Sequence, residues 1–136
     1  MTGIRTLSMA SQQVLAAYVD NAKEGMYARV AGDMANGTSL RGYVDTSYAN
    51  LVSLFGEPDE GDEYKVDAEW TLYFADGKGG GEVVTIYNYK DGKNYCGEEG
   101  TEVEDITDWH VGGRTGMAPV YVQRALDIIT GTKLEA

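Results

Sequence analysis

Histidine and cysteine, the residues that most often carry nucleophilic or metal chemistry, each occur once in the chain, as His110 and Cys96. A zinc site needs three or four thiolate or imidazole ligands close together, so this composition predicts none. Residues 59–63 (DEGDE) supply carboxylate oxygens but lack the distal bidentate glutamate of a calcium loop. We therefore expect no metal site and interpret the acidic run as a solvated loop.

Catalytic chemistry has no recognisable motif in this sequence. Neither Cys96 nor any serine stands in a known nucleophile motif. His110 could act as a base, but a single histidine beside Trp109 in a strand more often has a structural role. The carboxylates are too numerous for any pair to be singled out. We predict no catalytic residue and no cofactor, and we do not expect an enzyme.

The segment 112–116 (GGRTG) is the stretch best suited to bind a ligand. Glycines let the backbone approach a ligand closely, and free amides at a helix start attract phosphate. Arg114 would add a bidentate donor for phosphate oxygens. The pattern matches neither a P-loop nor a dinucleotide fingerprint. By the motif alone, a flexible connection between a strand and a helix is the better interpretation.

Length and charge narrow the classes of function. With 136 residues the chain is expected to form one domain, residues 1–136. The formal net charge of -11 repels phosphate polymers and anionic membranes, so we expect no nucleic-acid or membrane partner. A small anionic ligand or a basic protein remains compatible with it. A single cysteine, no long apolar run and no secretion signal are typical of a cytoplasmic protein. The 10 tyrosines suggest half-buried strand positions or an aromatic-rich interface or pocket.

Helical spacing of apolar residues predicts four helices. We expect them over residues 9–22, 26–35, 47–55 and 119–129, with residues 1–8 flexible and residues 9–38 forming a helical N-terminal extension. In the third helix the apolar face is Tyr48, Leu51, Val52 and Phe55, and Gly56 ends it. Pro119 suits the first turn of the last helix.

Period-two alternation predicts the sheet. Residues 64–74 alternate apolar and polar side chains, glycine-rich residues 76–81 form a hairpin connection, and residues 82–90 return. Shorter strands are expected over 39–44 and 106–111, and an excursion loop over 94–104. The order predicts an α+β fold: an antiparallel meander sheet with N-terminal helices and a C-terminal helix packed on one face.

Four segments together carry a resemblance to a known family: 55–58 (FGEP), 65–70 (KVDAEW), 85–90 (TIYNYK) and 106–113 (ITDWHVGG). They resemble small uncharacterised phage proteins and, with them, the anti-Thoeris sponge proteins of phages. That family sequesters cyclic ADP-ribose isomers made by immune enzymes without cleaving them, and some members also hold cyclic oligonucleotides. The likeness spans about residues 43 to 125.

The resemblance implies a pocket shared between protomers of a homo-oligomer, a dimer or hexamer, in the host cell cytoplasm. Phe74 is similar to the aromatic residue that stacks on adenine, and Asn88 to the amide that reads polar groups. Arg114, next to Gly113, is similar to the arginine that meets the pyrophosphate, and Arg29 is a weaker candidate for a second arginine. From the residues alone, core packing is the better interpretation of Phe74, and a hydrogen bond to a loop is the alternative for Asn88.

Two functions follow from these observations. The first is a viral counter-defence protein that binds and sequesters a cyclic nucleotide immune signal without cleaving it. The second is an acidic protein-binding inhibitor that imitates nucleic acid and covers a basic surface of a host defence or DNA-binding protein. An enzyme that cleaves the signal is a third reading, against which the missing catalytic motif weighs.

Overall fold

A computed structural model describes residues 4–6, 19, 21–60 and 64–130 of the chain, and for residues 4–6 it gives the backbone alone. The helix predicted over residues 9–22 falls mostly outside this description. Among the described residues no helix is long and apolar enough to cross a membrane.

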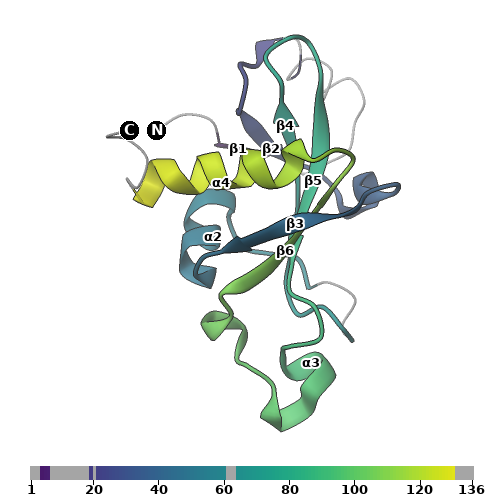
Figure 1. Ribbon diagram of the computed structural model, residues 1–136, viewed down its shortest axis with the longest axis vertical. Helices are drawn as coiled ribbons and strands as arrows, with labels where there is room; N and C mark the ends of the chain where they lie inside the picture. The colour runs from purple at the N-terminus through teal and green to yellow at the C-terminus, as the bar shows by residue number, and fades with distance from the viewer. Residues whose placement is uncertain (1–3, 7–18, 20, 61–63, 131–136) are drawn as a thin grey trace.

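The centre of the fold is a six-stranded sheet with the strand order β1-β2-β4-β5-β6-β3 (Figure 1). Its strands are β1 (Ile4–Thr6), β2 (Tyr27–Arg29), β3 (Ser39–Asp45), β4 (Glu69–Ala75), β5 (Gly81–Tyr87) and β6 (Asp108–Gly113). All neighbours pair antiparallel except β1, which runs parallel to β2. The β4-β5-β6 order is the predicted meander, and β3 lies beside β6 at one edge.

The β4–β5 hairpin turns as predicted between Ala75 and Gly81, which are paired. The Asp76 carboxylate closes the turn, because its Oδ1 accepts hydrogen bonds from the amides of Lys78 (2.7 Å) and Gly80 (3.0 Å). These amide donors lower the pKa of Asp76 below its usual value.

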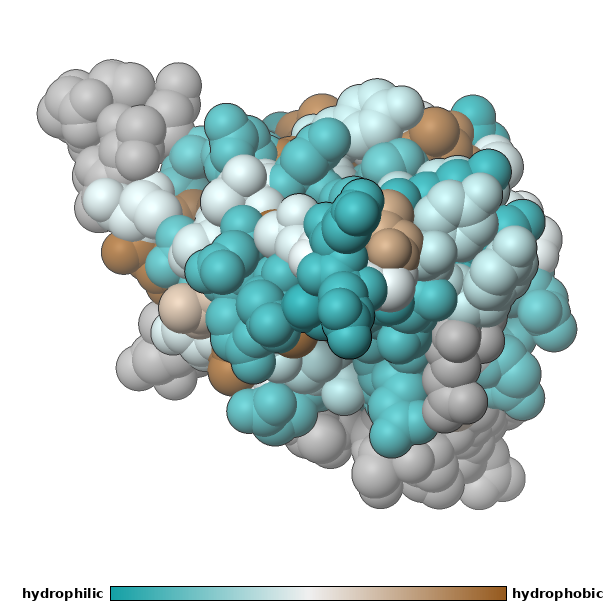
Figure 2. Space-filling model, turned by 90° about the horizontal axis from the view of Figure 1, so that it is seen from below, coloured by the Kyte–Doolittle hydropathy of each residue, from teal (hydrophilic) through white to brown (hydrophobic). Residues whose placement is uncertain are grey.

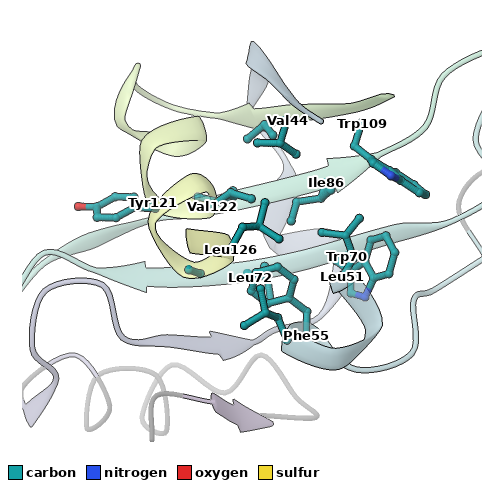
Figure 3. Close-up of a cluster of buried hydrophobic side chains, with 14 of the residues drawn as sticks. Val44, Leu51, Phe55, Trp70, Leu72, Ile86, Trp109, Tyr121, Val122 and Leu126 are labelled. Atoms are coloured by element: carbon teal, nitrogen blue, oxygen red, sulfur yellow. The ribbon is translucent and has the colours of Figure 1, made fainter. Parts of the chain in front are cut away.

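Two helices, α2 (Tyr48–Phe55) and α4 (Met117–Thr130), cover one face of the sheet. The amide of Asn50 donates to the Ser47 hydroxyl at the start of α2, and Gly56 ends the helix with a φ of 85°. The core lies between these helices and the sheet (Figure 3). Its largest fully buried side chains include Trp70, Trp109, Phe74, Leu51, Leu72 and Ile86. The chain thus has the predicted α+β fold, with the C-terminal helix packed against the sheet.

The buried polar atoms of the core have partners in nearby backbone. The two tryptophans meet edge to face, 5.5 Å between ring centroids. The Trp70 indole N–H donates to the Gly56 carbonyl at 2.7 Å, and that of Trp109 to the Thr46 carbonyl at 3.2 Å. Each tryptophan therefore fixes the chain at one end of α2 to the sheet, because an unpaired buried N–H would cost free energy.

The helix predicted over residues 26–35 is wrong. Strand β2 occupies Tyr27–Arg29, and a short 3-10 turn follows at Gly32–Ala35. Tyr27 pairs with Phe74 across the sheet, so pairing with β4 prevails over local helical spacing. Gly25, at a φ of 88°, sets the turn into this strand.

Other boundaries also differ from the sequence prediction: β5 ends at Tyr87 rather than at residue 90, and β6 covers Asp108–Gly113 rather than residues 106–111. Strand β4 begins at Glu69 rather than at residue 64, because the amides of Asp67 and Ala68 bind the Asn88 side chain instead of a neighbouring strand. The excursion loop predicted over residues 94–104 contains short helical turns. These are α3 (Lys93–Cys96), Gly97–Glu99 and Val103–Asp105.

Candidate functional site

The face of the sheet opposite α2 and α4 carries an aromatic cluster around the single histidine. The ring of His110 lies 4.8 Å from that of Tyr43, 5.4 Å from Tyr87 and 5.6 Å from Tyr89, measured between centroids. We call these four residues the tyrosine–histidine cluster. Register explains it, because His110 on β6 pairs with Tyr43 on β3 and with Tyr87 on β5.

Part of the cluster faces solvent. Tyr43 is 58% exposed and Tyr89 is 40% exposed, so each ring has surface that another ring can cover. The Nδ1 atom of His110 is buried and makes no hydrogen bond within the described part of the chain. Among the described residues the Thr71 hydroxyl oxygen shares this condition, and such unpaired buried polar atoms are unusual in folded proteins.

A hollow of about 220 Å³ adjoins the cluster and is lined by Tyr87 and Tyr89 together with Thr38, Ser39, Glu69, Thr85 and Gly112. Gly112 keeps its floor open. A Cβ atom at this position would lie 2.5 Å from the Thr85 hydroxyl oxygen, which is closer than such atoms approach. A glycine is therefore required where β6 passes Thr85, and the hollow offers hydroxyl, carboxylate and ring surfaces.

The hydroxyl of Tyr87, one of the two tyrosines that line this hollow, stays protonated. Burial raises the pKa of Tyr87 above its usual value, and the charges of Glu69, Tyr43 and Tyr89 raise it further. At neutral pH the Tyr87 side chain can therefore donate a hydrogen bond to a ligand as well as accept one.

Two arginines lie where β6 leaves the sheet. Arg114 donates from Nη2 to the Asn36 carbonyl at 2.9 Å. Arg41 donates to the Gly113 carbonyl at 3.1 Å and to the Arg114 carbonyl at 2.7 Å. Because Asn36 precedes the hollow-lining Thr38 and Ser39 by only a few residues, the Arg114 contact holds the turn that borders the hollow. Both arginines are exposed residues.

Phe74, predicted to stack on adenine, is a core residue in this structure. It is fully buried, its ring is stacked on that of Tyr121 (5.3 Å, 10° between planes), and it also meets Tyr27 at 5.2 Å. Aromatic neighbours from β2 and α4 thus cover the surfaces that a base would need. Phe74 therefore packs in the core, which is the interpretation that its residue type alone favoured.

Asn88 and Arg29 are each engaged elsewhere. The Asn88 amide is fully buried and bonds Asp67, Ala68 and Asp91. Arg29 donates to the Phe55 carbonyl at 2.7 Å and lies 3.7 Å from an Asp59 carboxylate oxygen. Both side chains therefore tie the ends of secondary-structure elements together.

Of the five predicted site residues, only Gly113 and Arg114 lie together, and they adjoin Gly112 at the hollow. Gly113 is buried, and a Cβ there would lie 2.5 Å from that of Ala118. The structure does not bring Phe74, Asn88 or Arg29 to this place. Whether a second protomer completes a site with them stays a prediction.

Sequence reasoning did not find the tyrosine–histidine cluster. The signal was present in the count of 10 tyrosines and in the alternation that put Tyr87 and Tyr89 on one face of a strand. What the sequence lacked was the pairing of β3 with β6, which brings Tyr43 to His110.

No known protein family, curated protein or solved structure matches the chain. The resemblance to phage sponge proteins therefore stays a prediction.

Other features of the described residues offer less. A hollow of about 450 Å³ between β2, α2 and α4 is lined mainly by apolar side chains such as Met26, Leu54 and Ile129. The Glu24–Arg124 ion pair at 2.9 Å already uses the charges at its border. No group of three or more metal-ligating side chains occurs within the described ranges.

Proposed function

We propose that the protein binds a small nucleotide and holds it without cleaving it. The observation that carries the proposal is the tyrosine–histidine cluster: two partly exposed tyrosines whose rings lie against His110, beside a hollow on the sheet face opposite the helices. Stacking of a base on an aromatic side chain is worth roughly 1–3 kcal/mol, and His110 and Tyr87 supply hydrogen-bonding atoms next to the exposed rings.

The charge distribution favours a small ligand over a polymer. A net charge of -11 repels a long phosphate chain, whereas one or two phosphates need only a local cation. Arg114, which bonds the turn beside the hollow, and Arg41, which bonds the Arg114 carbonyl, supply such charge. We expect the base to cover Tyr43 or Tyr89 and the phosphate to lie toward these arginines.

The resemblance supplies the more specific proposal. It makes the ligand a cyclic nucleotide immune signal, either a cyclic ADP-ribose isomer or a cyclic oligonucleotide. The protein would then be a phage counter-defence protein acting in the host cell cytoplasm as a homo-oligomer. In such an assembly the cluster and Arg114 would face a neighbouring protomer.

The test is a release experiment. The purified protein is incubated with a panel of cyclic ADP-ribose isomers and cyclic oligonucleotides, separated from free ligand and heat-denatured, and the released compounds are identified by mass. We expect an intact nucleotide. A product of altered mass would mean an enzyme, and the absence of any bound nucleotide would reject the proposed function.

Variants assign the binding to the cluster. Whichever of Tyr43 and Tyr89 carries the base, its change to Ala should weaken binding about 5- to 100-fold, the equivalent of one lost stacking contact. Ile128→Ala is the matched control, because Ile128 is 60% exposed on α4, away from the cluster. Binding that survives both tyrosine changes would reject this site.

Two further variants separate the cluster from the residues that the resemblance names. Arg114→Ala should weaken binding, because it removes positive charge near the hollow. Its thermal transition is measured as well, because the side chain also bonds the Asn36 carbonyl. Phe74→Ala is expected to cost about 3–5 kcal/mol of stability, since it empties part of the core. A loss of binding in that variant would therefore report on folding unless its thermal transition is measured alongside.

A second candidate function rests on the acidic end of the molecule. All six carboxylates of residues 98–108 are exposed: Glu98, Glu99, Glu102, Glu104, Asp105 and Asp108. Figure 2 looks at the end where α3 lies, and hydrophilic residues cover most of its centre. This surface supports an inhibitor that covers a basic protein, as predicted from the charge.

The inhibitor proposal makes a different prediction about salt. Immobilised protein should retain a basic host protein at low ionic strength and lose it at high ionic strength, because exposed charges are screened. Glu98→Gln with Glu99→Gln should weaken the retention, whereas Tyr43→Ala should leave it unchanged. Retention of no basic protein at low salt would count against this function.

A further inference from the structure

A second aromatic surface continues from the tyrosine–histidine cluster. The Lys90 ammonium nitrogen lies 5.4 Å from the ring centroid of Tyr89 and 5.4 Å from that of Tyr95. Tyr95 in turn lies 5.4 Å from Tyr64, and the Lys65 nitrogen lies 5.7 Å from the Tyr64 ring. We call Tyr64, Lys65, Tyr89, Lys90 and Tyr95 the tyrosine–lysine band; it shares Tyr89 with the cluster.

Backbone geometry builds this band. Lys90 has a φ of 64°, in the left-handed region that few residues other than glycine and asparagine adopt readily. Its amide donates to the Lys65 carbonyl at 2.8 Å, and its carbonyl accepts from the Cys96 thiol at 3.3 Å. The Lys90–Lys65 hydrogen bond places Tyr64 and Lys65 beside the turn at Lys90. The Lys90–Cys96 hydrogen bond places α3, which carries Tyr95, next to the same turn.

The band gathers positive charge in an acidic chain. Of the five lysines in the described part of the chain, Lys65, Lys90 and Lys93 lie in or next to it. Lys93 is paired with Glu102 at 3.4 Å, whereas Lys90 lies between two aromatic rings. An ammonium group between two exposed rings is placed to meet a phosphate whose two flanking bases cover those rings.

We propose that the ligand of this site carries two nucleobases joined through phosphate. One base stacks at the cluster on Tyr43 or Tyr89, and the second stacks on Tyr95 or Tyr64. The phosphate that joins the two bases lies at Lys90, and the phosphate on the other side of the first base lies toward Arg41 and Arg114. This inference rests on the proposed nucleotide-binding function and specifies its ligand class.

The exposure of Tyr64 and Tyr95 in the tyrosine–lysine band favours a ligand with two bases rather than a ligand with one base. Tyr64 is 57% exposed and Tyr95 is 41% exposed, values similar to those of Tyr43 and Tyr89 in the cluster. A ligand with one base would cover one pair of rings and leave the other in water. A ligand with two bases covers both, and each stacked base adds roughly 1–3 kcal/mol of binding free energy.

Matched probes with one and two adenines test the inference by calorimetric titration. The probes are 3′,5′-cyclic AMP, 3′,5′-cyclic di-AMP and linear pApA. We expect at least one two-base probe to bind about tenfold or more tightly than cyclic AMP. Whichever of Tyr95 and Tyr64 carries the second base, its change to Ala should reduce that preference and leave cyclic AMP binding unchanged. Lys90→Asn should weaken only the two-base probes, because asparagine tolerates the left-handed backbone but lacks the charge.

The outcomes separate this inference from the proposed function. Equal binding of one-base and two-base probes, with Tyr95→Ala and Tyr64→Ala silent, overturns the two-base ligand and leaves nucleotide binding intact. If none of the probes binds, the compound released in the panel experiment decides. A released nucleotide with two or more bases supports the inference, one with a single base overturns it alone, and no released nucleotide overturns both. Circular dichroism on each variant checks that the fold is retained.

Discussion

The Asn88 side chain is bound to Asp67 through both of its polar atoms. Asn88 Oδ1 accepts from the Asp67 amide at 2.7 Å, and Asn88 Nδ2 donates to the Asp67 carboxylate at 2.8 Å. Asn88 Oδ1 also accepts from the Ala68 amide at 3.1 Å, and Asn88 Nδ2 also donates to the Asp91 carboxylate at 3.0 Å. One fully buried side chain therefore joins the approach to β4 with the turn after β5.

Replacing Asn88 should destabilise the fold. Asn88→Ala leaves the buried amides of Asp67 and Ala68 without acceptors, so we expect a loss of about 2–4 kcal/mol. Urea unfolding followed by tryptophan fluorescence measures it. The control is Asn36→Ala, at an exposed residue in a turn, which should change the unfolding free energy by less than about 0.5 kcal/mol. Equal unfolding midpoints for the two variants would contradict the role of Asn88.

The Glu82 carboxylate holds the start of α4 from a neighbouring strand. Its Oε2 accepts from the amides of Arg114 and Thr115, each at 3.2 Å, and its Oε1 accepts from the Thr115 hydroxyl. Glu82→Gln turns an amide NH₂ toward these donors, so we expect a loss of about 1–3 kcal/mol. Unfolding by urea measures the change, and Glu99→Gln on the exposed surface is the control. A Glu82→Gln variant as stable as wild type would show that these contacts contribute nothing net.

The sheet was predictable from the sequence where its local pattern was strong. Alternation in residues 64–74 predicted one apolar face, and Trp70, Leu72 and Phe74 of that face lie in the core cluster. The helix over residues 26–35 failed because Tyr27 pairs with Phe74, 47 positions away, and nothing in the local spacing reports such a partner. In short segments without a clear periodicity, pairing with neighbouring strands decides the secondary structure.

The candidate site was less predictable than the fold. Tyr43, Tyr87 and His110 come from three strands, and their contact depends on a register that a single sequence does not reveal. The ligand-binding segment singled out by its glycines does border the hollow, through Gly112. Phe74 fits a stacking residue by type alone, but its position on the inner face of β4 makes it part of the core.

Alkaline pH should destabilise the protein through Tyr27. Burial raises the pKa of Tyr27 from 10.0 to about 12. In the unfolded chain this phenol ionises near its usual pKa, so rising pH stabilises the unfolded state before the folded state. Its contribution to stability is complete below about pH 10 and is lost as the pH rises toward 12. Unfolding free energies measured between pH 8 and 12 should therefore fall.

Tyr27→Phe isolates this contribution. The variant loses a hydrogen bond of 3.4 Å to the Leu54 carbonyl, so we expect a cost of at most about 1 kcal/mol at neutral pH. Above pH 10 its unfolding free energy should fall less steeply than that of wild type. Parallel pH profiles for the two proteins would show that Tyr27 does not carry the alkaline loss.

Gly112 and Thr85 are coupled across β6 and β5, where they are paired. Gly112→Ala places a Cβ 2.5 Å from the Thr85 hydroxyl oxygen and 3.3 Å from the Ser39 carbonyl oxygen, so we expect a loss of about 1–3 kcal/mol. Gly32→Ala is the control, because a Cβ there meets nothing within 4 Å.

Because the atom nearest to the added Cβ is the Thr85 hydroxyl oxygen, Thr85→Ala should relieve the collision. The double variant should then be more stable than the sum of the single changes predicts, by about 1 kcal/mol. Additive losses would mean that the Ser39 backbone, rather than Thr85, excludes a side chain from the floor of the hollow.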